Sequence, residues 1–155
     1  SVIIGLALKL NNYGESISLE HDITYANITS ENMGINELEM KSVVKHSPLI
    51  EYDNLEQKWK WYDINELKFS NKIDMLIVDG PPRITHELAR YPAIPILHEY
   101  FSDRFTIFLD DSKRDDEAII IQKWIVFLET NKYKVKIENF INYEKGMTIL
   151  QVYRC

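Results

Sequence analysis

Three stretches of the chain share one pattern, a short apolar run that ends in an acidic residue. In residues 73–79, five of the first six side chains are apolar, and an aspartate, a glycine and two prolines close the run. A continuous apolar run bounded by such breakers predicts a strand buried on both faces. Residues 105–110 repeat the pattern, and residues 17–20 do so more briefly. Ligands of open α/β sheets bind at the carboxyl ends of strands, so we predict that the terminal acids share one edge and one site. These acids are Glu20, Asp79 and Asp110.

Helical patterns alternate with these runs in the first half of the chain. Residues 2–10 are apolar nearly all round and are followed by Gly14, which predicts a buried helix with a glycine cap. A strand over residues 2–8 is the alternative, because the start is β-branched. Asp22 is a suitable N-cap for a helix that runs to about Met33 and ends at Gly34.

The middle of the chain is harder to assign. We expect a strand over residues 40–45 and an irregular segment over residues 49–70 that contains a short helix after Asp63. Residues 85–91 and 92–100 have helical patterns, and a proline is acceptable in a first helical turn.

The last third of the chain predicts a helix and a hairpin. Three acids at residues 115–117 favour a helix start because they complement the helix dipole. Strands over residues 134–141 and 147–153 flank a glycine-containing loop at 142–146, which is typical of a hairpin. The expected buried face of the helix consists of Ala118, Ile121, Trp124, Ile125 and Leu128.

The order of these elements predicts an α/β fold. Strands alternate with helices until the final pair, which indicates a doubly wound, mostly parallel sheet with a C-terminal antiparallel hairpin. The 155 residues suit a single domain.

Composition narrows the function classes. The net charge of −6 comes without a basic cluster, so a general nucleic-acid binder is not expected. One cysteine, Cys155, excludes a disulfide framework and a cysteine-rich zinc site. The sequence contains no apolar run of membrane-spanning length and opens without a signal-peptide pattern, so no membrane partner and a cytoplasmic location are expected.

Taken together, several segments resemble the class I S-adenosylmethionine-dependent methyltransferases, and more closely a bacterial subgroup distantly similar to catechol-type O-methyltransferases. The resemblance implies a Rossmann-like fold and methyl transfer from S-adenosylmethionine to a small acceptor, with oxygen as the expected methyl acceptor. It covers nearly the whole chain. The matching segments, in the order of the family, are 18–22, 46–49, 61–63, 74–82, 89–93 and 109–117, with Trp124.

The resemblance assigns roles to residues near the strand ends. Glu20 would accept hydrogen bonds from the cofactor ribose, as a carboxylate at a strand end can; the alternative is a solvated loop acid. His46 and Ser47 would contact adenine, unless they form only a turn before a proline. Asp79 would also contribute to the cofactor site. Arg90 could face a substrate, but structural pairing with the acids at 115–117 is favoured.

Asp79 and Asp111 are the candidate catalytic residues, and three interpretations of them stay open. Asp79, Asp110 and Asp111 could hold a divalent cation such as Mg²⁺, which would lower the pKa of an acceptor hydroxyl. Asp79 could instead orient the substrate without a metal. Alternatively, Asp79 belongs to a stiff turn and Asp111 caps a helix.

One departure from the family concerns the start of the chain. The family begins with a central strand and a glycine-rich cofactor loop, and neither is present in this sequence. We therefore expect an N-terminally incomplete domain. Its sheet would be completed by direct pairing of the strands ending at Glu20 and Asp79 or by a strand from a neighbouring copy in a homo-oligomer. A non-catalytic domain that has lost the cofactor loop is the alternative to an enzyme.

Overall fold

The structure is a computed structural model that describes residues 1–53, 57–140 and 144–155. The chain forms two compact units, which are described separately. Unit 1 comprises Ser1–Ile50 and Tyr62–Glu66, and unit 2 comprises Glu51–Trp61 and Leu67–Cys155.

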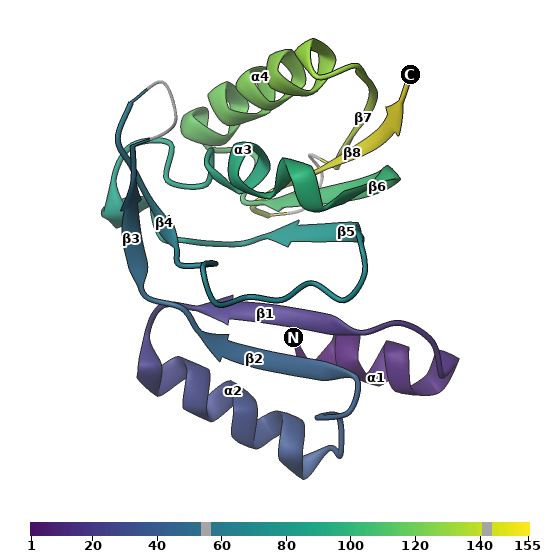
Figure 1. Ribbon diagram of the computed structural model, residues 1–155. Coiled ribbons are helices and arrows are strands. Elements are labelled where there is room, and N and C mark those ends of the chain that lie inside the picture. Colours follow the sequence, from purple (N-terminus) through teal and green to yellow (C-terminus); the bar gives the residue numbers. More distant parts are fainter. Residues whose placement is uncertain (54–56, 141–143) are drawn as a thin grey trace. The chain divides into compact units, whose positions relative to one another are not determined.

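Unit 1 is built on two parallel strands and two helices. Its elements are α1 (Val2–Asn11), β1 (Ser16–Glu20), α2 (Ile23–Ile35) and β2 (Ser42–His46). β1 pairs in parallel with β2, and α2 is the crossover that parallel neighbours require (Figure 1). The register places Glu20 opposite His46, so the carboxyl ends of the two strands meet.

Helix α2 confirms the predicted cap at Asp22. The carboxylate of Asp22 accepts hydrogen bonds from the backbone N–H groups of Thr24 and Tyr25, which an N-terminal turn leaves without helical partners. The predicted end at Gly34 is one residue early, since the helix continues through Ile35.

Residues 2–8 are helical, so the alternative of a strand there is wrong. The expected glycine cap is wrong as well. Asn12 takes the left-handed conformation at φ 50°, which asparagine tolerates, and its N–H donates to the Lys9 carbonyl. The helix is also not buried: Gly5 is its buried residue, while Ile3 and Leu10 are 82% and 86% exposed. An apolar pattern on every side of a helix does not identify which side packs.

Two short strands replace the irregular segment expected over residues 49–70. β3 (Leu49–Tyr52) and β4 (Trp59–Tyr62) form a two-stranded sheet. Trp59, Trp61 and Tyr62 are buried, which fits aromatic residues in strands. The helix predicted after Asp63 is a turn instead, in which the Asp63 carboxylate accepts from the Asn65 N–H.

Unit 2 contains a four-stranded mixed sheet in the order β5-β6-β8-β7 (Figure 1). Its strands are β5 (Ile73–Val78), β6 (Phe101–Asp110), β7 (Tyr133–Phe140) and β8 (Met147–Arg154). β5 and β6 are parallel, whereas β8 is antiparallel to both β6 and β7. The predicted α/β class with a C-terminal antiparallel pair is confirmed. The loop predicted at 142–146 lies partly outside the described residues.

The strands ending at Glu20 and Asp79 belong to different sheets. β1 is assigned to the two-stranded sheet with β2, and β5 to the four-stranded sheet beside β6. The direct pairing of β1 with β5, expected as one way to complete the sheet, is therefore not formed in the described part of the chain.

The helical segments of unit 2 differ in one place from expectation. They are η1 (Arg83–Thr85), α3 (Ala93–Leu97), η2 (His98–Tyr100) and α4 (Asp115–Thr130). Residues 92–100 are largely helical as predicted, with Pro92 as the N-cap of α3. The helix predicted over residues 85–91 does not form, because Leu88 adopts a left-handed φ of 53° that interrupts helical hydrogen bonding.

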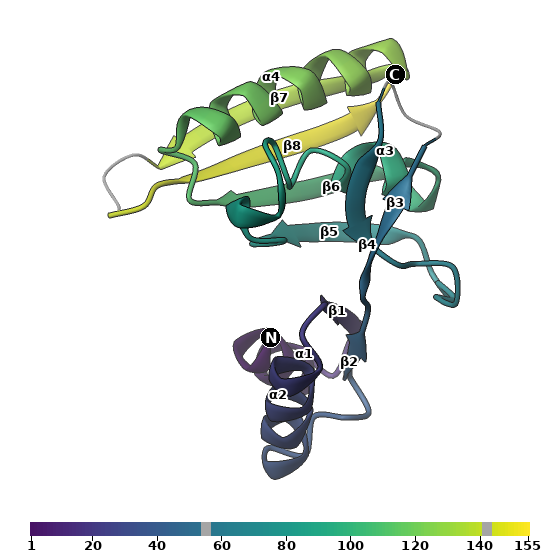
Figure 2. The ribbon, with the colours of Figure 1, turned by 90° about the vertical axis from the view of Figure 1, so that its left-hand side faces the viewer.

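Helix α4 lies across one face of the sheet (Figures 1 and 2) and buries the core of unit 2. Its first turn contains the three predicted acids. The buried face is shifted from the expected one: Ala118 is exposed and Ile120 is buried, alongside Trp124 and Leu128. Within the described residues, no helix is long and apolar enough to cross a membrane.

Trp124 anchors α4 to the segment that precedes α3. Its side chain is fully buried, and its indole N–H donates to the Tyr91 carbonyl at 2.7 Å. Trp124→Phe should lower the free energy of unfolding by about 1–3 kcal/mol, because it removes the buried hydrogen bond to the Tyr91 carbonyl, and the smaller ring leaves a void that adds to this loss.

Urea denaturation followed by far-ultraviolet circular dichroism measures this effect. Val126→Ala on the same helix is the control, since Val126 is 63% exposed, and it should change stability by less than about 0.5 kcal/mol. Equal losses in the two variants would contradict the anchoring role.

Candidate functional site

The carboxyl ends of β5 and β6 bring three aspartates together. Val78 and Leu109 are register partners in these parallel strands, so the next residues, Asp79 and Asp110, lie at the same edge. One carboxylate oxygen from each of Asp79, Asp110 and Asp111 lies within 4.8 Å of the others. The convergence of acids predicted for the ends of these two strands is therefore observed in unit 2.

A sharp turn positions Asp111. Its φ of 56° is left-handed, a conformation that aspartate tolerates better than most residues. The backbone N–H groups of Ser112 and Lys113 donate to the carbonyls of Gly146 and Lys145, which hold the turn against the start of β8. As a result, the side chain of Asp111 is buried at the strand edge while that of Asp79 is 71% exposed.

Arg90 is the central cation of this acidic cluster. Its side chain is 5% exposed, and its two terminal nitrogens donate to the carbonyl oxygens of Asp110 at 2.8 Å and Asp79 at 2.9 Å. The same guanidinium lies 3.2 Å from the Asp111 carboxylate and 3.4 Å from Glu117. Structural pairing of Arg90 with the acids of 115–117 was predicted, and the contact with Glu117 confirms it.

Arg114 and Lys145 complete the charge pattern and were missed by the sequence analysis. Arg114 lies 2.7 Å from Asp111 and 3.7 Å from Glu117, and Lys145 lies 3.9 Å from Asp111. The signal for Arg114 is present in the sequence, because it is three residues from each acid. Lys145 carries no such signal, since the hairpin brings it to the site from a distant position.

The local electrostatics distinguish the carboxyl groups. Desolvation at the strand end and the negative charges of Asp110 and Asp111 raise the pKa of Asp79, while Arg90 opposes this rise. Burial likewise raises the pKa of Glu117, against the opposing effect of Arg90 and Arg114. Asp79 is therefore the exposed carboxyl whose proton affinity is increased by its neighbours.

The donor set suits a hard divalent cation. Three carboxylates are the ligand type that Mg²⁺ prefers. The Oδ1 atom of Asp111 is buried and, in the described part of the chain, has no hydrogen-bond partner, whereas Oδ2 contacts Arg90 and Arg114. A cation would satisfy this oxygen and reduce the repulsion that raises the pKa of Asp79.

In unit 1, the predicted cofactor residues gather at the ends of β1 and β2. The Oε1 atom of Glu20 accepts from the Asp22 N–H and lies 3.0 Å from His21. The Ser47 N–H donates to the Glu20 carbonyl, and its buried hydroxyl donates to the Asp63 carbonyl at 2.8 Å. Ser47 therefore takes part in a turn, which was the alternative to a contact with adenine.

His46 is also tied to this strand edge. Its Nε2 atom lies 3.1 Å from the His21 carbonyl oxygen. This contact links the end of β2 to the residue that follows β1, so the ends of both strands are joined by side-chain as well as backbone contacts.

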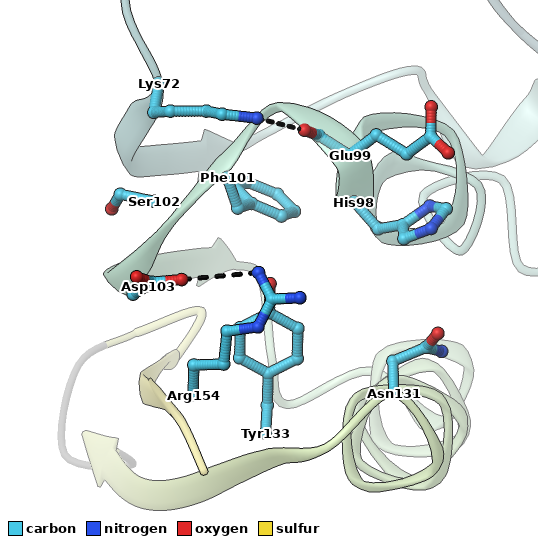
Figure 3. Close-up of a pocket in the computed structure, with 9 residues that line it drawn as sticks. All are labelled: Lys72, His98, Glu99, Phe101, Ser102, Asp103, Asn131, Tyr133 and Arg154. Carbon is cyan, nitrogen blue, oxygen red and sulfur yellow. Dashed lines mark hydrogen bonds and ion pairs between the residues drawn. The ribbon is translucent and has the colours of Figure 1, made fainter.

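A pocket of about 590 Å³ lies elsewhere in unit 2, at the amino ends of β6 and β7 (Figure 3). Two of its cations are engaged with neighbours: Lys72 donates to the Glu99 carbonyl, and Arg154 pairs with Asp103. No residue of the aspartate cluster lines it. The pocket therefore does not coincide with the predicted site. The convergence of acids is the better indicator of a functional site, because groups with a perturbed pKa gather at such sites.

Sequence comparisons identify no relative, because neither a protein-family model nor a curated protein matches the chain.

Comparison of structures does find proteins with a similar fold. An O-methyltransferase from Bacillus cereus, solved in complex with S-adenosylhomocysteine (SAH), has a TM-score of 0.61 at 13% identity over 91% of this chain. A methyltransferase from Pyrococcus furiosus has a TM-score of 0.64 at 11% identity over 100% of this chain and 71% of its own. The SAH-bound N-terminal domain of human METTL16 gives 0.59 at 17% identity, over 96% of this chain and 55% of its own.

These similarities establish that the chain has a class I methyltransferase fold, as the sequence resemblance implied. The chain spans 63% of the length of the Bacillus protein, which is less than two thirds. At these identities the likeness concerns the fold, and the chemistry has to be argued from the site.

The aspartate cluster predicts a measurable titration. The pKa of Asp79 should lie above the ordinary aspartate value, and Asp110→Asn should lower it by removing a neighbouring negative charge. Because folding raises this pKa, the folded state binds the proton more tightly than the unfolded chain. The stability contribution of Asp79 therefore declines as the pH rises from the ordinary value through the raised one.

Carbon-detected NMR of the side-chain carboxyl measures this titration. Asp103→Asn is the control, because Asp103 pairs with Arg154 at the other end of β6, and it should leave the Asp79 titration unchanged. A midpoint that does not respond to Asp110→Asn would show that the two acids are not coupled.

Proposed function

We propose that this chain is a methyltransferase domain that transfers a methyl group from S-adenosylmethionine to an oxygen of a small acceptor. The fold supports the methyl-transfer class, since similar structures are described as an O-methyltransferase in complex with SAH and as a methyltransferase. The observation that carries the proposal is the cluster of three aspartates at the carboxyl ends of β5 and β6. In open α/β sheets this edge is where ligands bind.

Asp79 is the residue that meets the acceptor in this proposal. It is the exposed member of the cluster, and its raised pKa improves a carboxylate as a proton acceptor. The acceptor oxygen forms a bond to the methyl carbon, the carbon–sulfur bond breaks, and the hydroxyl proton passes to Asp79 or to water. Such an in-line displacement depends mainly on alignment, so orienting the hydroxyl is the main task of Asp79.

Asp79, Asp110 and Asp111 would hold a divalent cation such as Mg²⁺ beside the acceptor. When bound, the cation would lower the pKa of the acceptor hydroxyl and so supply the more reactive alkoxide. Asp111 would present its Oδ1 atom, because Arg90 and Arg114 occupy the other oxygen.

The cofactor roles fall mainly to the strand ends of unit 1. Glu20 would accept the ribose hydroxyls through its carboxylate, and His46 and Ser47 would contact the adenine, with Asp79 also near the cofactor. Glu20 keeps Oε2 for such a contact, since Oε1 is the oxygen bonded to the Asp22 N–H. We further propose a small-molecule acceptor, no nucleic-acid or membrane partner, a cytoplasmic location, and possible assembly with a second copy.

Glu20→Ala should weaken binding of SAH. Loss of a charge-assisted hydrogen bond costs about 1.5–3 kcal/mol, or roughly 10- to 150-fold in dissociation constant. Isothermal titration calorimetry measures the affinity, and Glu31→Ala, at an exposed position of α2, is the control expected to bind normally. Unchanged affinity in the Glu20 variant would exclude the ribose role, and absence of SAH binding by the unmodified protein would favour the non-catalytic alternative.

Asp79→Asn should lower kcat by roughly 100-fold or more while leaving SAH affinity within about twofold, because it removes a proton acceptor and preserves shape. Turnover of a panel of small hydroxyl compounds by radiolabelled methyl transfer measures the effect. Chelation provides the parallel test of the cation: activity should be lost with a chelator and return with added Mg²⁺. Full activity after chelation would exclude the cation but leave the role of Asp79 intact.

A further inference from the structure

Arg90 contacts all three residues of the aspartate cluster in addition to Glu117. It lies between η1 and α3, and its guanidinium is buried beneath the ends of β5 and β6. It cannot contact a bound acceptor from that position, since 5% of its side chain is exposed. Any influence on the reaction must therefore pass through the residues that it touches.

The guanidinium bridges the two strand ends. Nη1 donates to the Asp110 carbonyl at 2.8 Å and Nη2 donates to the Asp79 carbonyl at 2.9 Å. These carbonyls follow Val78 and Leu109, the last register partners of the parallel pair, so they lie beyond the end of the β5–β6 ladder, while Asp110 still pairs with Met147 of β8. The planar, rigid fork of arginine fixes the distance between two acceptors, which a single ammonium group cannot do.

The same group selects the oxygen that Asp111 presents. Nη2 of Arg90 and the Arg114 guanidinium lie 3.2 Å and 2.7 Å from Oδ2 of Asp111. The other oxygen, Oδ1, stays buried without a hydrogen-bond partner in the described residues, and its cationic neighbour is Lys145, whose Nζ lies 3.9 Å away. Nη2 also lies 3.4 Å from the Asp79 carboxylate, so one nitrogen touches both candidate catalytic residues.

Glu117 also pairs with Arg90. Its Oε1 atom lies 3.4 Å from Nη1, the nitrogen that donates to the Asp110 carbonyl, and its side chain is 4% exposed. Glu117 belongs to the first turn of α4, which Trp124 ties to the Tyr91 carbonyl next to Arg90. Arg90 is thus held by α4 as well as by the two strand ends.

We propose that Arg90 is a positioning residue that sets the spacing of Asp79 and Asp110 and directs Oδ1 of Asp111 into the reactive cluster. The inference rests on the proposed methyl transfer. Methyl transfer then requires the forked guanidinium of Arg90, and not only its positive charge.

Arg90→Lys tests this requirement, because it keeps the charge and loses the bridge. We expect kcat to fall by roughly 10- to 100-fold, the range for a small misplacement of reacting groups, with SAH affinity within about twofold of the unmodified protein. Arg83→Lys is the matched control. Arg83 pairs with Asp116 at an exposed position and contacts none of the three aspartates, so its turnover should be unchanged.

A purely structural role is distinguished by the kinetics of the folded variants. It would lower stability and leave turnover per folded molecule unchanged, whereas the positioning role predicts a lower kcat with nearly unchanged SAH affinity. Arg90→Lys should also shift the amide resonances of Asp79 and Asp110, to whose carbonyls Arg90 donates, and Arg83→Lys should not. Folded Arg90 variants with unaltered turnover and unaltered Asp79 and Asp110 resonances would overturn the proposal.

Failure of the proposed function and failure of the variants to fold have separate consequences. If the unmodified protein neither binds SAH nor transfers methyl groups, the proposed function fails, and the NMR comparison still decides whether Arg90 positions the acids. If the Arg90 variants do not fold, the side-chain N–H groups of Arg90 are followed in the unmodified protein. Their hydrogen bonds to the Asp110 and Asp79 carbonyls should slow their exchange with water, and fast exchange would overturn the proposal.

Discussion

The structure of unit 2 depends on a buried guanidinium that must be matched by negative charge. A buried cation is costly unless it is paired and hydrogen-bonded, and Arg90 meets both conditions through two carbonyl oxygens and three carboxylates. This requirement links the ends of β5 and β6, the left-handed turn at Asp111 and the first turn of α4. Stability and the geometry of the candidate site therefore rest on the same contacts.

The residues that the sequence identified at the ends of β5 and β6 do converge. This prediction worked because a parallel pair places its carboxyl ends together by geometry, and an apolar run ending in an acid marks such an end. Asp22 was found for a similar reason, since a helix cap is a local arrangement of one side chain and two N–H groups. Structural features that depend on residues close together in the sequence were therefore predictable.

The failures involve distant contacts or backbone choices that leave no pattern. Leu88 adopts a left-handed conformation, which no residue preference indicates, and it removes the helix expected there. The apolar residues of α1 predicted burial, yet Ile3 and Leu10 are exposed, because composition does not specify a packing partner. Lys145 approaches Asp111 only through the hairpin fold. The β3–β4 pair was overlooked because each strand has four residues, which is too short for a clear pattern.

In the proposed methyltransferase, the acid-bearing strand ends bind the cofactor and the reacting groups. Amide chemical shifts of the isotope-labelled protein during titration with SAH measure this binding residue by residue. We expect saturable changes that are largest at Glu20, at Asp79 and at Asp110–Asp111. Changes confined to the pocket of Lys72, His98 and Asn131, or no saturable change at any residue, would contradict it.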